Sequence, residues 1–258
     1  MKIQFIVVGW HYNQSEFYES LSEMEQTNEN VDVFWTCHKE PPQEIKDSFD
    51  WKLFDNLGEE FIAYQQAVDY LDLDDETFCF FIHDDCIIKN WEFVNICVGK
   101  ILNGDFKWMG NCFNYPMPEL NPQENLGNGI TEEFDNATYI DYVKDENKHF
   151  FDRVISPVMI IRGSFICTQY KYLKEIGEFE PRKEAWVAPH WSDEHQTYCY
   201  RNEKGLGSFG NVFMFLLSYK VNRHFGPQQI GYLSDRYLDS DYIYEMGRGK
   251  IDERNPMT

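Results

Sequence analysis

The chain has 258 residues, of which 43% are hydrophobic and 17% aromatic, enough apolar material for a substantial folded core. Lys and Arg total 23 against 44 Asp and Glu, which gives a formal charge of −21. Because the basic residues are scattered, this charge opposes binding to nucleic acids and to anionic membrane surfaces.

The seven cysteines predict reduced, buried thiols. Their number is odd, the spacing C-x-x-C does not occur, and most of them lie in apolar runs. The sequence contains neither a recognisable signal peptide nor a stretch near the roughly 20 apolar residues that span a membrane. We therefore expect a cytoplasmic protein without a transmembrane segment.

The first 112 residues alternate between expected strands and helices. Hydrophobic periodicity predicts strands at 3–8, 31–35, 77–82 and 106–112, and helices at 16–21, 59–71 and 91–102. Ser15 is expected to cap the first helix, a polar loop to fill 25–30, and Gly104 to end the third helix. This βαβ series predicts a doubly wound, mostly parallel mixed sheet with helices on both faces.

The second half is less regular. Residues 114–152 are rich in Asn, Pro, Glu and Asp, and we expect a long surface loop there. Further expectations are strands at 158–161 and 212–217, a short helix at 170–176 ended by Gly177, and a helix from Asp193 to about Lys204. The acidic, Tyr-rich segment 227–258 is expected to be a loosely ordered tail.

The most informative stretch is the apolar run 77–82, which ends abruptly in His83, Asp84 and Asp85. Charged groups at the end of a buried strand are solvated, paired or bound to a metal. Two carboxylates beside an imidazole suit a divalent cation such as Mg²⁺ or Mn²⁺. The alternative is an ordinary strand-to-turn transition in which Asp84 and Asp85 are turn or capping residues.

Three strand ends are expected to line one crevice: Gly9-Trp10, Thr36-Cys37-His38 and His83-Asp84-Asp85. In doubly wound sheets ligands bind at the carboxyl ends of the strands, so this crevice suits a ligand of nucleotide size. Trp10, Trp35 and His38 are candidates for stacking or edge contacts with a base, and core packing is the alternative for each.

The order of elements over residues 3–226 resembles the GT-A type of nucleotide-sugar glycosyltransferase, most closely glycosyltransferase family 2. Phe80 to Asp85 stands where that family has its DXD motif, with His83 replacing the first acidic residue. Gly163-Ser164, followed by 173–179, looks like the segment that lines the acceptor side. Trp191-Ser192-Asp193-Glu194 occupies the place of the catalytic Glu-Asp pair, and His224-Phe225-Gly226 that of a third metal ligand.

The resemblance implies a role for each of these residues. Asp85 would bind the metal directly, Asp84 would hold the ribose or a metal-bound water, and His224 would complete the metal shell. His83, beside the loop at Gly9 and Trp10, would contact a phosphate or the ribose. Asp193 or Glu194 would be the catalytic base, kept ionised by the N-terminus of the helix expected there.

The implied activity is metal-dependent transfer of a sugar, of the hexosyltransferase type and with inversion, from a nucleotide sugar to a hydroxyl group. The cation would be Mn²⁺ or Mg²⁺, the favoured donor a UDP-sugar, and the acceptor a carbohydrate, a lipid-linked molecule or a protein. Residues 1–226 would form one domain, with a nucleotide-binding half at 1–112 and an acceptor and catalytic half at 113–226.

Two other functions stay open at this point. A non-catalytic carbohydrate- or nucleotide-binding protein on a GT-A scaffold is favoured by His83 and by the unusual sequence at Asp193-Glu194. A nucleotidyltransferase ranks third, because such enzymes carry a Gly-rich basic loop after the first strand. Here that loop, residues 9–13, has no basic pair.

Overall fold

The computed structural model describes ten stretches of the chain, and the fold below refers to these. They are residues 1–55, 60–112, 161–179, 190–192, 197–202, 205–208, 217–218, 220–222, 224–234 and 240–245. The expected long loop at 114–152 lies outside the described residues, as do Asp193 and Glu194.

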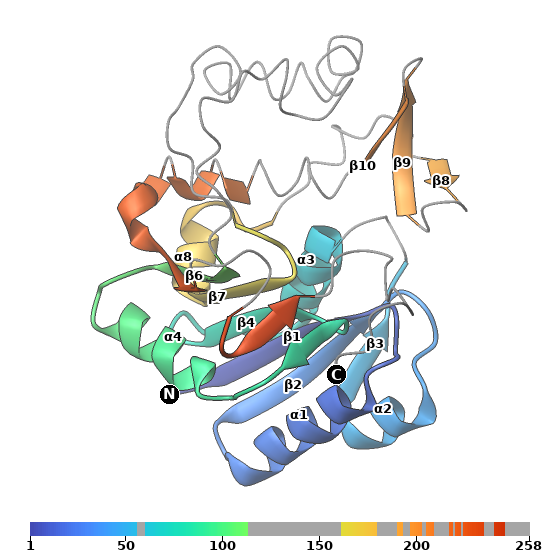
Figure 1. Cartoon of the computed structure of the whole chain (residues 1–258), viewed down its shortest axis with the longest axis horizontal. Coiled ribbons are helices and arrows are strands. Elements are labelled where there is room, and N and C mark those ends of the chain that lie inside the picture. Colours follow the sequence, from blue (N-terminus) through green and yellow to red (C-terminus); the bar gives the residue numbers. More distant parts are fainter. Residues whose placement is uncertain are drawn as a thin grey trace.

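A seven-stranded sheet organises the described part, in the order β11-β6-β7-β4-β1-β2-β3 (Figure 1). Its strands are β1 (Ile3–Gly9), β2 (Val31–Cys37), β3 (Asp50–Leu53), β4 (Phe78–His83), β6 (Trp108–Cys112), β7 (Phe165–Gln169) and β11 (Ile230–Ser234). Only the two pairings made by β7 are antiparallel, and the other four are parallel. The predicted mixed, mostly parallel sheet is confirmed.

Helices cover both faces of the sheet, because side chains of each strand alternate between two cores. In β1, Ile3, Phe5 and Val7 join one buried cluster with residues of α1 (Ser15–Thr27), α2 (Gln43–Ser48) and α4 (Phe93–Leu102). Ile6 and Val8 join the other, with α3 (Glu60–Tyr70) and α8 (Tyr170–Glu175). Figure 1 shows α1 and α2 on one side of the sheet and α3 and α8 on the other.

The chain reverses its direction across the sheet between β1 and β4. From β1 it moves outward through β2 to β3, with α1 and α2 on one face. It then returns through α3, on the opposite face, to place β4 on the other side of β1. Such a reversal is the point at which doubly wound sheets bind their ligands, at the carboxyl ends of the strands.

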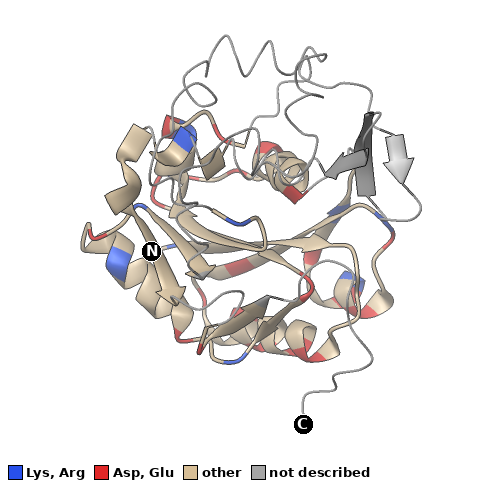
Figure 2. Ribbon diagram, turned by 45° about the horizontal axis from the view of Figure 1, so that its top comes forward, with Lys and Arg blue, Asp and Glu red and all other residues tan. Residues whose placement is uncertain are grey.

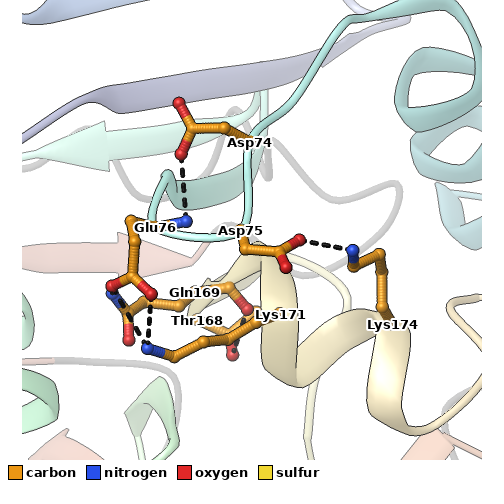
Figure 3. Close-up of polar contacts among 7 residues, drawn as sticks. All are labelled: Asp74, Asp75, Glu76, Thr168, Gln169, Lys171 and Lys174. Carbon is orange, nitrogen blue, oxygen red and sulfur yellow. Dashed lines mark hydrogen bonds and ion pairs between the residues drawn. The ribbon is translucent and has the colours of Figure 1, made fainter.

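The antiparallel strand β7 and the following helix α8 are tied to the start of β4 by polar contacts (Figure 3). The Lys171 ammonium lies 2.9 Å from Glu76 Oε1, and Gln169 Nε2 donates to Glu76 Oε2 at 3.2 Å. Lys174 forms a second ion pair with Asp75. Exposed pairs of this kind add little stability singly. Together they join β7 and α8 to the segment just before β4.

Several predicted helix ends are confirmed and others are wrong. Gly104 and Gly177 both follow helices with φ of +78°, the left-handed conformation that glycine adopts readily. Ser15 is inside α1 and does not cap it, since Gln14 precedes the helix. The same helix continues to Thr27, so the predicted loop at 25–30 is wrong at its start. The short elements α2 and β3 were not predicted.

The described residues after 226 include two paired strands, so the expectation of a loosely ordered tail is wrong for that part. A 3₁₀ turn at Pro227–Gln229 leads into β11, which pairs with β6. Further on, β12 (Ile243–Glu245) pairs with β5 (Cys86–Ile88), the strand that directly follows Asp85.

The helix predicted from Asp193 to about Lys204 is also wrong. Thr197–Asn202 is a strand, β9, which pairs with β8 (His190–Ser192) and β10 (Gly205–Ser208) in a small separate sheet. Its first four residues are Thr, Tyr, Cys and Tyr, and the Thr and Tyr among them are residue types that favour strands. Leu217, placed in a predicted strand, is helical, and residues 212–216 lie outside the described part.

The surface and the thiols of the described part agree with the composition. Figure 2 shows acidic positions spread over helices and connecting segments. Cys37, Cys79, Cys86, Cys97 and Cys167 are free and buried, as predicted. Among the described helices none combines the length and the apolar character needed to cross a membrane.

Candidate functional site

The carboxyl ends of β1, β2 and β4 lie side by side, as the sequence predicts. In the parallel register, Val8 pairs with Thr36 on one side and with His83 on the other. The backbone N–H of Asp84 donates to the carbonyl of Val8 at 3.2 Å, which continues the contact one residue beyond β4. The three predicted strand ends therefore form one edge, next to the reversal point of the sheet.

Asp84 is buried behind this edge and holds the loop that follows β1. Asp84 is 1% exposed, and its Oδ2 accepts hydrogen bonds from the backbone N–H groups of Trp10, His11 and Tyr12 at 2.9, 2.7 and 2.8 Å. Burial raises the pKa of Asp84, and these amide bonds oppose that rise. Oδ2 is thus used by the loop amides, and the predicted contact of Asp84 with a ribose or a metal-bound water stays a prediction.

Gly9 and Tyr12 fit together in the same loop. Tyr12 has a φ of +52°, a left-handed conformation that is uncommon for a side-chain-bearing residue. Its ring fills the space beside Gly9, where an added Cβ would come within 2.6 Å of it. The Tyr12 hydroxyl donates to the carbonyl of Lys39 at 3.1 Å, so the ring joins the loop to the end of β2.

His83 and Asp85 form a pair at the end of β4. His83 Nδ1 lies 3.7 Å from Asp85 Oδ1, and Asp85 is only 8% exposed. The imidazole lies beside the ring of Tyr64, with centroids 6.2 Å apart and the planes tilted by 34°. The Tyr64 hydroxyl in turn donates to the carbonyl of Gly163 at 2.7 Å. The backbone N–H of His83 donates to the carbonyl of Ser164 at 3.1 Å.

This arrangement brings two distant predicted segments together. The Gly163-Ser164 segment precedes β7, whose antiparallel register puts Phe165 opposite Ile82. Gly163 and Ser164 therefore flank the end of β4, next to His83. Their predicted place on the acceptor side stays a prediction, but their position beside the candidate site follows from the sheet.

The His83–Asp85 pair fits a divalent cation only in part. His83 Nε2 is buried and has no hydrogen-bond partner within the described residues. Imidazole nitrogen and carboxylate oxygen are both ligands that Mn²⁺ accepts. Within the same residues, however, no three His, Cys, Asp or Glu side chains gather as a metal site. A cation held by one carboxylate and completed by substrate phosphates and water is the arrangement that fits.

The three candidates for base contacts have different surroundings. Trp35 is fully buried in the cluster on the α1 and α2 side of the sheet, so its indole offers no surface to a ligand. Trp10 is partly exposed, with the Lys39 ammonium 5.3 Å from its ring. His38 Nε2 lies 3.0 Å from Gln66 Oε1, and burial lowers the pKa of His38. Trp10 and His38 thus stay candidates.

The predicted third metal ligand, His224, lies away from this pair. Its Nε2 is 3.2 Å from Glu175 Oε2 in α8, and the neighbouring Phe225 packs against Tyr172 of the same helix. That helix begins where the Tyr170 N–H donates to the carbonyl of Thr77, at the start of β4. The six residues of β4 span about 20 Å. His224 is therefore near the opposite end of the strand, and the predicted metal set is not assembled.

Two contributions to the site were not predicted. Tyr64 occupies one of the apolar positions of a regular helix, so the sequence does not distinguish it from a core residue. The C-terminal segment also reaches this region. Asn111 Nδ2 donates to the carbonyl of Ile243 at 3.2 Å, and Lys89 Nζ to that of Ser240 at 3.0 Å. The first bond ties β12 to β6, and the second joins the residue after β5 to the segment before β12, which itself pairs with β5 next to Asp85.

No family model and no curated protein matches the chain. Solved structures do. Glucosyl-3-phosphoglycerate synthase from Mycobacterium tuberculosis, in complex with Mn²⁺, UDP-glucose and phosphoglyceric acid, matches at 11% identity and a TM-score of 0.47. The match covers 98% of this chain and 74% of that one. The mannosyltransferase PcManGT from Pyrobaculum calidifontis, in complex with GDP-mannose and Mn²⁺, matches at 11% identity and a TM-score of 0.40. It covers 69% of this chain and 47% of that one. Similarity at this level assigns no residue role and no substrate to the chain.

Proposed function

We propose that the protein is a metal-dependent glycosyltransferase that uses a nucleotide sugar. The observation that carries the proposal is the His83–Asp85 pair at the carboxyl end of β4, beside the point where the sheet reverses. A nearly buried carboxylate at that edge is suited to a cation that also binds phosphate oxygens. The sequence resemblance to GT-A enzymes over the same residues supports the same class.

In this proposal the residues of the edge divide the work of holding the donor. Asp85 holds the cation, which when bound stabilises the negative charge that develops on the leaving diphosphate. His83 Nε2, buried and directed by its contacts with Tyr64 and Asp85, hydrogen-bonds a phosphate or the ribose. Trp10 and His38 lie at the neighbouring strand ends and contact the base.

The acceptor hydroxyl needs a base to take its proton as it attacks the anomeric carbon. Asp193 or Glu194 is proposed for this step, with inversion at that carbon. The support is their place in the sequence pattern. The helix dipole that the sequence suggested does not contribute, because the residues that follow form β9.

The main alternative is a binding protein without catalysis. It is supported by Asp84, whose carboxylate holds the loop after β1, and by His83 in the place of an acidic residue. A nucleotidyltransferase is less well supported. The loop amides that could hold a triphosphate already bind Asp84, and the loop contains no basic pair.

Release of nucleoside diphosphate from sugar nucleotides tests the proposal. Purified protein would be incubated with UDP-glucose, UDP-N-acetylglucosamine, GDP-mannose or dTDP-glucose, with Mn²⁺, with Mg²⁺ or with EDTA. We expect cation-dependent release from at least one donor, and its loss in Asp85→Asn. Cation-dependent nucleotide binding without release from any donor would support the binding protein instead.

The proposed base is tested separately. In Asp193→Asn and Glu194→Gln, we expect one of the two to lose transfer at least 100-fold while donor binding changes little, in line with the usual contribution of a general base. If both variants transfer sugar at the wild-type rate, neither residue is the base.

A further inference from the structure

We propose that Asp84 is a positioning residue that serves as the built-in anion of the loop after β1, and that it is not a ligand of the cation or the ribose. The part of this inference that concerns the donor rests on the proposed function. The part that concerns the loop itself does not.

The geometry is that of an anion site formed by backbone amides. The consecutive N–H groups of Trp10, His11 and Tyr12 converge on one oxygen, Asp84 Oδ2, at 2.7 to 2.9 Å. Runs of amides that face a single point bind anions, and bonds from an amide to a carboxylate are stronger than those to a neutral oxygen. Because Asp84 is 1% exposed, its carboxylate is largely shielded from water.

The backbone of Asp84 is also held by a hydrogen bond. Its N–H donates to the carbonyl of Val8, so β1 supplies a contact just before the loop that the carboxylate holds. On the other side of the loop, Tyr12 has a left-handed φ and donates to Lys39. That conformation has an energetic cost, and the bond from the Tyr12 amide to Asp84 offsets part of it.

The consequence concerns where an anionic ligand can bind. In many doubly wound folds the loop after the first strand donates its amides to the ligand's phosphates. Here the same amides are already bonded to Asp84. The loop is therefore formed before any ligand binds, and a diphosphate would be held elsewhere along the edge, through the cation that Asp85 is proposed to bind. Asp84 and Asp85 are adjacent in sequence but act in different ways.

Hydrogen exchange measures the loop contact without reference to any ligand. In the wild type we expect slow exchange at the amides of residues 10–12. In Asp84→Asn we expect these amides to exchange at least 10-fold faster, because a neutral amide oxygen accepts three N–H bonds poorly. Asp105→Asn, at an exposed position, is the matched control and is expected to leave them unchanged. Exchange in Asp84→Asn at the wild-type rate would overturn the inference.

Rescue by a small anion is the sharper test. Asp84→Ala leaves the three amides facing a space of carboxylate size, so formate or acetate is expected to raise its melting temperature. The same salts, compared with chloride at equal ionic strength, are expected to leave wild type and Asp105→Asn unchanged. A folded Asp84→Ala variant that responds no more than the wild type would overturn the inference. If this variant does not fold, hydrogen exchange in Asp84→Asn decides.

Cation titration separates the two aspartates. At saturating UDP, we expect Asp84→Asn to keep the wild-type Mn²⁺ midpoint within about twofold, and Asp85→Asn to shift it at least 10-fold. An equal Mn²⁺ shift in both variants would make Asp84 a ligand and overturn the inference. If no nucleotide binds to the wild type, the proposed function fails, and exchange and rescue still decide the role of Asp84.

Discussion

The hydroxyl of Tyr64 offers a direct test of how the site is supported. The ring is fully buried, and its hydroxyl donates to the carbonyl of Gly163, also buried, at 2.7 Å. Tyr64→Phe removes the donor and leaves the carbonyl without this bond, a loss of about 1–3 kcal/mol. Taking about 2 kcal/mol as the central value, the melting temperature of a chain of this size should fall by about 4–8 °C.

The assay is thermal and denaturant unfolding of wild type, Tyr64→Phe and Tyr70→Phe. Tyr70 is the matched control, since it lies in the same helix but is 54% exposed, and its variant should stay within about 0.5 kcal/mol of wild type. Because Gly163 and Ser164 flank His83, Tyr64→Phe should also weaken nucleotide binding. A Tyr64→Phe variant as stable as Tyr70→Phe would refute the support that we assign to this hydrogen bond.

Three further predictions concern the fold, the pH dependence and the thiols. Gly231→Ala should destabilise by about 1–3 kcal/mol, because the new Cβ would meet Phe106 and Met109 within 2.6 Å, whereas Gly99→Ala in α4 meets nothing within 4 Å and should stabilise by up to about 1 kcal/mol. Equal effects of the two changes in urea unfolding would argue against the packing of β11. The pKa of His38 is lowered in the folded chain, so below about pH 6.5 the unfolded chain binds a proton that the folded chain does not. The free energy of unfolding therefore decreases as the pH is lowered through this range. The difference in unfolding free energy between wild type and His38→Gln should therefore shrink between pH 7.5 and 5.5, and a constant difference would contradict the assignment. Finally, Cys37, Cys79, Cys86, Cys97 and Cys167 should react with a thiol reagent only on unfolding, since they are buried and burial raises the pKa of Cys37 to about 11. Mapping of the modified peptides by mass spectrometry would show any exception.

Most of the parallel part of the sheet could be predicted because periodicity and strand length agree there. The runs at 3–8, 31–35 and 77–82 are buried on both faces, and the long helices between them carry regular apolar positions. Elements that depend on distant partners could not be predicted in this way. The exposed edge strand β3 and the strand β12, which pairs with β5, have little apolar pattern of their own.

The candidate site was predicted at the level of position more than of role. The carboxyl edge and the His83–Asp85 pair follow from strand ends that a parallel sheet must bring together. The bonds from three backbone amides to Asp84 could not be predicted, since such contacts leave no signal in the sequence. The role of His224 was predicted from the resemblance alone. In the structure His224 contacts Glu175 in α8, away from the His83–Asp85 pair.

The measurement that tests the central claim most directly is nucleotide binding to wild type and Asp85→Asn, with and without Mn²⁺. A nucleoside diphosphate at about 100 times its dissociation constant should stabilise the wild type by about 2.7 kcal/mol, or about 5–11 °C in melting temperature. UDP or GDP should give this shift with Mn²⁺, a smaller one with EDTA, and little added effect of Mn²⁺ in Asp85→Asn. If none of UDP, GDP, dTDP and CMP shifts the wild type with or without Mn²⁺, the proposed site at the end of β4 is wrong.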